Sequence, residues 1–333
     1  MQAKELTFDQ LVAEADRLGL ELPIEQTPEW ASYEETVPGR TFWGCVAIQD
    51  DGGETLGVAA FTDYETHGYH YLRSHHGPVW TRELTEEEER EGMVALREFV
   101  SARDRKVVFV RLAIEHELDV SHPTLSMKPY DTTVVIDITG SDEDILARMK
   151  GRGRRDVRKA LRETPATYAD ETELAAKSFS EYYDVMVETS ARDGFAPAPI
   201  DDYENTIRCL GPEHCRVFAG RVDGRVITWT MATISGRHAV RYYGASRSGK
   251  ERALATDGLI FFECCTLGKM GCVDYDQMGI GSEEFPDLMT LNTFKTKFSK
   301  EVRHVSPDRD LPVRATFYKS LLAGKKILDK VRG

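Results

Sequence analysis

The chain has 333 residues, of which 41% are hydrophobic and 30% charged, and its formal net charge is −13. This length exceeds the size at which one hydrophobic core usually keeps growing, so we expect two domains. The sequence contains no run of about 18 apolar residues, which excludes a transmembrane helix. The first twenty residues are amphipathic and acidic, unlike a secretory signal peptide, so we expect a cytoplasmic protein.

The first half of the chain is predicted to be mixed α/β. Apolar and alternating runs indicate strands, and apolar residues at a 3.6-residue period indicate helices. The glutamates at 86–89 are typical of the first turn of a solvated helix. In chain order we expect a helix at 7–18, strands at 41–49, 55–65 and 69–74, a helix at 85–104 and a strand at 106–114.

The second half repeats this order of elements. A helix is expected to begin near Ser141, which provides a cap followed by an acidic first turn. The remaining elements are helices at 170–194 and 200–211, strands at 215–224, 225–236 and 237–246, a helix at 254–271 and a strand at 272–279. Two similar halves with several strands and a crossover helix each predict a duplicated α/β fold.

The region 241–279 has the strand, loop, helix, strand order of the N-acetyltransferase fold. That fold normally binds acetyl-CoA through a glycine-rich loop whose backbone N–H groups face the pyrophosphate. The loop before the helix here, "RSGKERALATDG", lacks the glycine pattern, so acyl-CoA is not expected to be the donor and no cofactor is expected. The six cysteines include no C-x-x-C pair, and we interpret them as reduced core thiols without a metal site.

Two basic segments interrupt the acidic chain. Residues 148–162 hold eight Lys or Arg and one acid, and residues 295–333 hold eleven Lys or Arg against four acids. In the first segment Arg155, Arg158, Lys159 and Arg162 share one helical face, while Leu146, Met149, Val157 and Leu161 are expected to form the apolar face. This pattern is typical of a solvated surface or of a site for a phosphate backbone.

The segment "FKTKF" at 294–298 places two lysines between phenylalanines. On a strand, Lys295 and Lys297 would point one way and Phe294 and Phe298 the other, because side chains alternate. Lys295 would then project beside an aromatic wall. The alternative is that both are ordinary surface lysines.

Several short motifs occur in a recognisable order along nearly the whole chain. They are "QTPEW" (26–30), "GPV" (77–79), "DTTVVIDITGSDEDILARMKGRGRRDVRKA" (131–160), "ARDGF" (191–195), "YYGAS" (242–246), "DYDQMGI" (274–280) and "FKTKF" (294–298). With these motifs the chain resembles the Fem family, the tRNA-dependent aminoacyltransferases that build interpeptide bridges in bacterial peptidoglycan.

The resemblance implies an architecture and a set of partners. Two N-acetyltransferase-like domains are expected in tandem, without a CoA site and without a coiled-coil arm. The first would comprise 1–138 with the tail 312–333 packed back on it, and the second 139–311. The implied partners are aminoacyl-tRNA and a lipid-linked or UDP-linked muropeptide. We expect a peripheral membrane contact, and a monomer or weak self-association.

The resemblance also implies roles for particular residues. Lys295 matches a family lysine near the aminoacyl ester, where a fixed cation would stabilise the oxyanion of ester aminolysis. Asp276 is a candidate proton acceptor, with a structural strand-end carboxylate as the alternative. The expected substrate contacts are Phe294, Tyr243, Tyr242 and Trp30, and the expected tRNA contacts are Arg154, Arg155, Arg158, Lys159 and Lys297.

The departures from the family pattern fall mainly on the acceptor side. Glu34 stands where a lysine is frequent, "HHGP" replaces "PRGP", "RLAI" replaces "R-x-D-P", and no arginine comes just before Tyr203. Three hypotheses therefore stay open: a cell-wall aminoacyltransferase, an aminoacyltransferase that acts on a small amine, and a catalytically silent protein that binds RNA or a partner.

Overall fold

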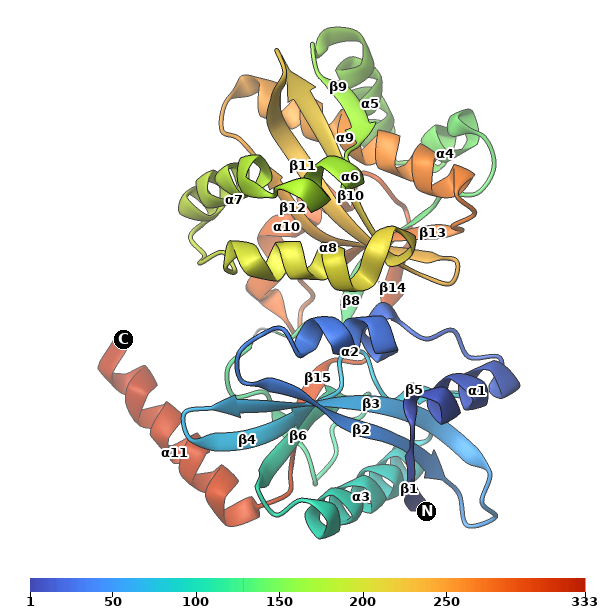
Figure 1. Cartoon of the computed structure of the whole chain (residues 1–333), viewed down its shortest axis with the longest axis vertical. Helices are drawn as coiled ribbons and strands as arrows, with labels where there is room; N and C mark the ends of the chain where they lie inside the picture. The colour runs from blue at the N-terminus through green and yellow to red at the C-terminus, as the bar shows by residue number, and fades with distance from the viewer. Residues whose placement is uncertain (128, 333) are drawn as a thin grey trace. The chain divides into compact units, whose positions relative to one another are not determined.

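The chain folds into two compact units, Met1–Pro129 with Ser306–Gly333, and Tyr130–Val305 (Figure 1). The computed structural model describes residues 1–127 and 129–332, without the side chains of 250–253 and 328–332. The divisions differ from the predicted boundaries after 138 and 311. The reason is strand pairing, because β8 (Thr132–Asp137) pairs with β13 in the second unit and β15 (Asp308–Pro312) pairs with β6 in the first.

The first unit is built on an eight-stranded sheet. Its path is β1 (Gln2–Leu6), β2 (Arg40–Gln49), β3 (Thr55–Thr66), β4 (Tyr69–Arg73), β6 (Val107–Ala113), β15 and β7 (His122–Pro123), with β5 (Val79–Trp80) paired to β3. Its helices are α1 (Phe8–Leu18), α2 (Pro28–Glu34) after the short η1 (Ile24–Gln26), α3 (Glu86–Arg103) and α11 (Ala315–Arg332). The predicted return of the tail 312–333 to the first half is confirmed, because Tyr318 of α11 packs with Phe109 of β6 at 5.4 Å.

The second unit has a seven-stranded sheet. Its order is β14 (Val302–His304), β8, β13 (Asp274–Ile280), β12 (His238–Ser246), β11 (Arg225–Ser235), β10 (Cys215–Val222) and β9 (Thr167–Asp170). Its helices are α4 (Asp142–Arg148), α5 (Gly151–Glu163), α6 (Thr172–Lys177), α7 (Ser180–Asp193), α8 (Ile200–His214), α9 (Lys250–Lys269) and α10 (Met289–Lys295), which follows η2 (Pro286–Leu288).

Each unit has its own hydrophobic core between its sheet and its crossover helix. In the first unit, Leu96 of α3 packs with strand residues such as Val46 and Val110. In the second, Leu259 of α9 and Val157 of α5 lie in one cluster with strand residues. The predicted duplicated α/β fold is therefore confirmed, with a strand, helix, strand crossover in each unit.

The basic segment is divided between two helices, which differs from the single helix expected. Ser141 caps α4 as predicted, through a capping box with Asp144. The backbone leaves the helical conformation at Met149 and Lys150, so α4 and α5 have different axes. Leu161 was expected on the buried face but is 54% exposed, because α5 makes its core contacts through Val157 and Ala160 instead.

Candidate functional site

The sheet of the second unit opens between its two parallel strands. β12 and β13 pair only from His238 to Val240, opposite Asp274 to Asp276. Beyond that point β12 remains paired with β11, and β13 remains paired with β8. Each of these two pairings contains a register shift. The two strands therefore diverge, and their facing backbone groups are not paired with one another. We call this region, formed by 241–246 of β12 and 277–280 of β13, the strand divergence.

A short helix brings Lys295 to the strand divergence. Asn292 of α10 accepts a hydrogen bond from the backbone N–H of Gly281 (2.9 Å) and donates one to its carbonyl (2.8 Å). Three residues later, the Lys295 ammonium donates to the carbonyl of Gly279 at 2.8 Å. The predicted strand at 294–298 is therefore wrong, because Met289–Lys295 is helical and is held by these contacts to the end of β13.

The environment of Lys295 lowers the pKa of its ammonium. Burial, and to a smaller extent the nearby Arg241 cation, lower this pKa to about 8, and Asp276 partly opposes them. Asp276 is the last residue of β13 that pairs with β12, and its carboxylate accepts a hydrogen bond from the backbone N–H of Met278 at 2.6 Å. Lys295 and Asp276, predicted from separate motifs, thus belong to one electrostatic cluster.

Two further charged residues belong to this cluster and were not predicted. Arg241 Nε lies 3.8 Å from the Glu263 carboxylate of α9, which also accepts a hydrogen bond from Tyr275 (2.8 Å). Burial raises the pKa of Glu263. Gly244 leaves room for the Arg241 guanidinium, because a Cβ there would lie 2.7 Å from its Cζ. The glutamate within "LIFFECC" was the available signal, since a charge in an apolar helix needs a buried partner.

Aromatic side chains come from β12 and α10, the elements that carry Arg241 and Lys295. Tyr243 packs against Tyr242 and against Tyr203 of α8, with ring centroids 5.3 and 5.0 Å apart. Phe294 meets Phe298 edge to face at 5.5 Å. Phe298 is buried in the core, whereas Phe294 is only partly buried. Phe294, Tyr242 and Tyr243 thus come from the same elements as Lys295 and Arg241.

Lys297 occupies a different environment from Lys295. Its ammonium forms an ion pair with Asp257 of α9 at 2.6 Å and lies 3.7 Å from Asp156 of α5. It also lies over the rings of Phe294 and Phe298 at 4.9 and 5.0 Å. The side chain is only 10% exposed. Lys297 therefore joins α5, α9 and the segment after α10, and its charge is balanced inside the unit.

The predicted tRNA residues on α5 divide into two groups. Arg154 donates to the carbonyls of Ala147 and Met149 (3.0 and 2.6 Å) and so satisfies the end of α4. Arg155, Arg158 and Lys159 are exposed. Arg155 and Lys159 form long surface ion pairs, with Asp156 at 3.6 Å and with Glu163 at 3.7 Å, and such contacts contribute little to stability. We call Arg155, Arg158 and Lys159 the α5 basic face.

Trp30 belongs to the first unit. It lies on α2, is 4% exposed, and packs against the rings of Tyr33 and His75 at 5.0 and 6.4 Å. Glu34, one turn later, accepts hydrogen bonds from Tyr64 (2.8 Å) and from Arg40 (3.2 Å). The carboxylate that replaces the frequent lysine is therefore buried and paired.

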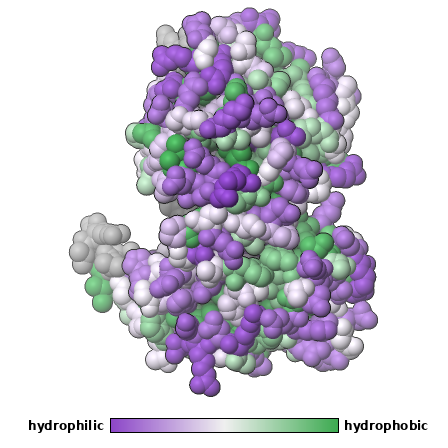
Figure 2. Space-filling model, in the orientation of Figure 1, coloured by the Kyte–Doolittle hydropathy of each residue, from purple (hydrophilic) through white to green (hydrophobic). Residues whose placement is uncertain are grey.

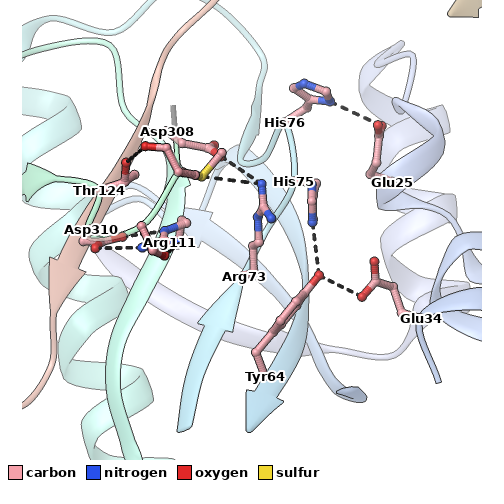
Figure 3. A network of polar contacts seen from close by, with 12 residues as sticks. Glu25, Glu34, Tyr64, Arg73, His75, His76, Arg111, Thr124, Asp308 and Asp310 are labelled. Atoms are coloured by element: carbon pink, nitrogen blue, oxygen red, sulfur yellow. Dashed lines mark hydrogen bonds and ion pairs between the residues drawn. The ribbon is translucent and has the colours of Figure 1, made fainter. Parts of the chain in front are cut away.

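Figure 3 shows the polar network around these residues. The Tyr64 hydroxyl also lies 3.2 Å from His75, whose pKa is lowered chiefly by burial. Arg73 of β4 pairs with Asp308 at 3.2 Å. Arg111 of β6 forms two hydrogen bonds with Asp310, at 2.7 and 3.0 Å. Acidic and basic side chains are paired with one another in this network. It therefore has no local excess of positive or negative charge.

Within the described residues, no group of three or more His, Cys, Asp or Glu has a metal-binding arrangement. In that same part of the chain, none of the helices is both long and apolar enough to cross a membrane. The loop predicted to lack a CoA motif includes 250–253, whose side chains lie outside the described residues.

Comparison with solved structures identifies the fold. FemX has a TM-score of 0.73 and 16% identity, over 96% of this chain and 99% of that one. A tandem GNAT protein from the clavulanic acid biosynthesis pathway has a TM-score of 0.55 and 11% identity, over 94% and 98%. L-PGS from Bacillus licheniformis has a TM-score of 0.53 and 11% identity, over 97% and 97%.

No family model matches the sequence, and no curated protein matches it. The structural likeness covers both units and nearly the full length of each of these proteins. The predicted fold, two GNAT-like units in tandem, is therefore confirmed.

Proposed function

We propose that the chain is an aminoacyltransferase that uses aminoacyl-tRNA as donor and the amine of a peptidoglycan precursor as acceptor. The observation that carries this proposal is the position of Lys295, whose ammonium is held at the strand divergence by the carbonyl of Gly279. The fold shared with FemX and the motifs that resemble the Fem family support the same reaction class.

The proposed reaction is aminolysis of an ester. The acceptor amine forms a bond to the carbonyl carbon of the esterified amino acid, and the bond from that carbon to the ribose oxygen breaks. The carbonyl oxygen becomes negative in the tetrahedral state. Lys295, as a fixed cation in a partly buried site, stabilises this oxyanion, and such a contact contributes about 2.7–4 kcal/mol.

The proposed reaction also requires two proton transfers. The amine must lose a proton as its bond forms, and the leaving ribose oxygen must gain one. Asp276 acts on the electrostatic environment of Lys295 and is our proposed proton acceptor. The hydrogen bond that it accepts from the backbone N–H of Met278 keeps the carboxylate oriented where β13 ends its pairing with β12. No protein nucleophile is required, because the ester is already activated.

The tRNA is proposed to bind through the α5 basic face. Three exposed cations on one helix supply the phosphate contacts that position a nucleic acid without reading its sequence. Arg154 and Lys297 are assigned structural roles in this proposal, since both have partners within the unit. Phe294, Tyr242 and Tyr243 are proposed to contact the aminoacyl end of the donor, and Trp30 to support the acceptor side.

A small amine is the second candidate acceptor. The position of Glu34 favours it, because a buried and paired carboxylate cannot bind the phosphates of a nucleotide-linked acceptor. The tandem GNAT protein of clavulanic acid biosynthesis has the same fold. This candidate keeps the donor and the proposed roles of Lys295 and Asp276, and changes only the amine.

The deciding experiment is transfer of radiolabelled amino acids from a charged total-tRNA pool to lipid-linked and nucleotide-linked muropeptides, with and without RNase. RNase-sensitive labelling of either acceptor supports the proposal and identifies both substrates. Labelling of neither muropeptide, but of added small amines, supports the second candidate. Binding of tRNA with no labelled product of any kind would overturn both and leave an RNA-binding protein.

A further inference from the structure

Arg241 is a buried cation whose hydrogen-bond donors are not all used. Hydrophilic residues cover much of the surface of the second unit in Figure 2, as is usual for charged side chains, but the side chain of Arg241 is only 14% exposed. Its Nε has no hydrogen-bond partner among the described residues. The Glu263 carboxylate lies 3.8 Å from this Nε, which is too far for a hydrogen bond. Arg241 therefore has a donor left for a group that the chain does not supply.

Two neighbours fix the guanidinium of Arg241 at the strand divergence. One is Glu263 of α9, which is fully buried and accepts a hydrogen bond from Tyr275 at 2.8 Å. The other is Gly244, where a Cβ would lie 2.7 Å from the guanidinium Cζ. Gly244 lies beyond the part of β12 that pairs with β13. The side chain of Arg241 therefore folds back along its own strand and lies against the diverging segment.

A buried arginine with a purely structural role is arranged differently, as Arg111 in the first unit shows. Arg111 is 3% exposed and donates two hydrogen bonds to Asp310, at 2.7 and 3.0 Å. A buried donor without a partner costs free energy, so structural sites satisfy such groups. Arg241 instead has a long ion pair with Glu263 and an unused Nε donor. The difference indicates that Arg241 binds a ligand.

The charges at this site favour an anionic ligand. Arg241 and Lys295 are two cations at the strand divergence, and the charge of Arg241 lowers the pKa of Lys295. An anion bound next to both would offset their repulsion. A planar guanidinium binds a carboxylate or a phosphate through two parallel hydrogen bonds, whereas a lysine acts as a point charge. A carboxylate or a phosphate is therefore the ligand chemistry that suits Arg241.

We infer that Arg241 is a second substrate-binding cation of the strand divergence, positioned by Gly244 and Glu263 to bind a substrate oxyanion. The inference rests on the proposed function for the two candidate oxyanions, which are the phosphate of the donor's terminal nucleotide and a carboxylate of the acceptor. Tyr242 and Tyr243 follow Arg241 on β12, and aromatic rings stack on nucleobases. These two tyrosines favour the nucleotide phosphate.

The test measures anion binding without turnover, by equilibrium dialysis of the full chain against radiolabelled probes at low salt. The probes are adenosine 5′-monophosphate with adenosine as its uncharged counterpart, and N-acetylalanine with its amide. We expect the phosphate probe to bind about tenfold or more tightly than adenosine. Arg241→Gln should weaken this binding about 10–100-fold, because a hydrogen bond to a charged group is lost. Arg241→Lys, which keeps the charge but loses the planar fork, should restore only part of it.

Gly244→Ala tests the position of the guanidinium without changing its charge. The added Cβ meets the flexible end of Arg241, so the side chain should move while the fold is kept. Binding of the phosphate probe should fall about tenfold. In the Arg241→Gln background the same change should have less than about a twofold effect, because the group that it displaces is gone. Arg237→Gln removes an exposed arginine just before β12 and is the matched control, with binding within about twofold of the parent protein.

Thermal unfolding checks that each variant is folded. Loss of N-acetylalanine binding instead, in the same variants, would assign the carboxylate. No preference for either anion over its uncharged counterpart, unchanged binding in Arg241→Gln, or a full Gly244→Ala effect in that background would overturn the inference. The radiolabel transfer assay decides separately on the reaction. Transfer with any of these outcomes removes only the inference, whereas anion binding through Arg241 without transfer removes only the proposed function.

Discussion

Each unit contains one parallel strand pair joined by a crossover helix. The two pairs differ in how the charges beside them are neutralised. In the first unit β4 and β6 pair from His70 to Arg73. Their last paired residues, Arg73 and Arg111, are neutralised by Asp308 and Asp310 of β15. In the second unit β12 and β13 separate after three residue pairs. Lys295 then reaches the strand divergence from outside the sheet.

The charged residues beside the two strand pairs have different roles. Asp310 accepts hydrogen bonds from Arg111, from Tyr318 and from the backbone of Leu125, so this buried group is fully paired and serves stability. Lys295 donates a hydrogen bond to the neutral carbonyl of Gly279, and the neighbouring Arg241 disfavours its charged form. An ammonium in that state retains charge for a substrate oxyanion.

Removing Asp310 should have the largest effect on stability. Asp310→Ala leaves Arg111 buried without its partner, and breaking such a pair costs about 3–5 kcal/mol. The free energy of unfolding, measured by urea titration, should fall by that amount. Asp308→Ala is the matched control, because Asp308 is more exposed and its 3.2 Å contact with Arg73 is looser. Equal losses in the two variants would contradict this account of the first unit.

Removing the Lys295 ammonium should have the largest effect on catalysis. Lys295→Met keeps the length and apolar character of the side chain but loses the cation. We expect the rate of aminoacyl transfer to fall about 10²–10³-fold, with tRNA affinity within about twofold of the parent protein. Single-turnover transfer from purified aminoacyl-tRNA measures the rate. Lys300→Met, an exposed lysine of the same segment, should retain activity.

The pH dependence of transfer should report the pKa of Lys295. If the charged form is required, the rate falls as the pH rises through that pKa, at about 8. Arg241→Gln removes a cation that lowers the pKa of Lys295, so the alkaline limb should move to higher pH. A limb that moves to lower pH, or does not move, would exclude this coupling. Arg105→Gln, on the first unit, is the control for a general charge effect.

The smallest effect is expected on tRNA binding. Arg155→Glu with Arg158→Glu should weaken tRNA affinity about tenfold or more. The slope of log affinity against log salt should become shallower by about one for each lost contact. Arg105→Glu with Lys106→Glu reverses two exposed charges of the first unit as the control. An unchanged salt slope in the α5 variant would remove the α5 basic face from the proposal.

Features of the fold that depend on neighbouring residues could be predicted from the sequence. Ser141 with Asp144 predicted the start of α4, and the repeated strand and helix periods predicted two α/β units. These features depend on neighbours in the chain, on capping and on which face is apolar. The boundary at β15 depends on a distant partner instead. The family resemblance assigned only 312–333 to the first half, and the pairing of Asp308–Pro312 with β6, about 200 residues away in the chain, was not predicted.

Only some residues of the candidate site could be predicted from the sequence. Lys295 and Asp276 were recognised from motifs, but alternation in "FKTKF" predicted a strand where α10 ends. Arg241 and Glu263 come from β12 and α9, and nothing local marks them as neighbours of a lysine. Local patterns and family motifs therefore predicted the fold of each unit and the residue types of the site. Which charges are neutralised and which remain for chemistry depends on tertiary contacts, because burial and ion pairing join residues far apart in the chain.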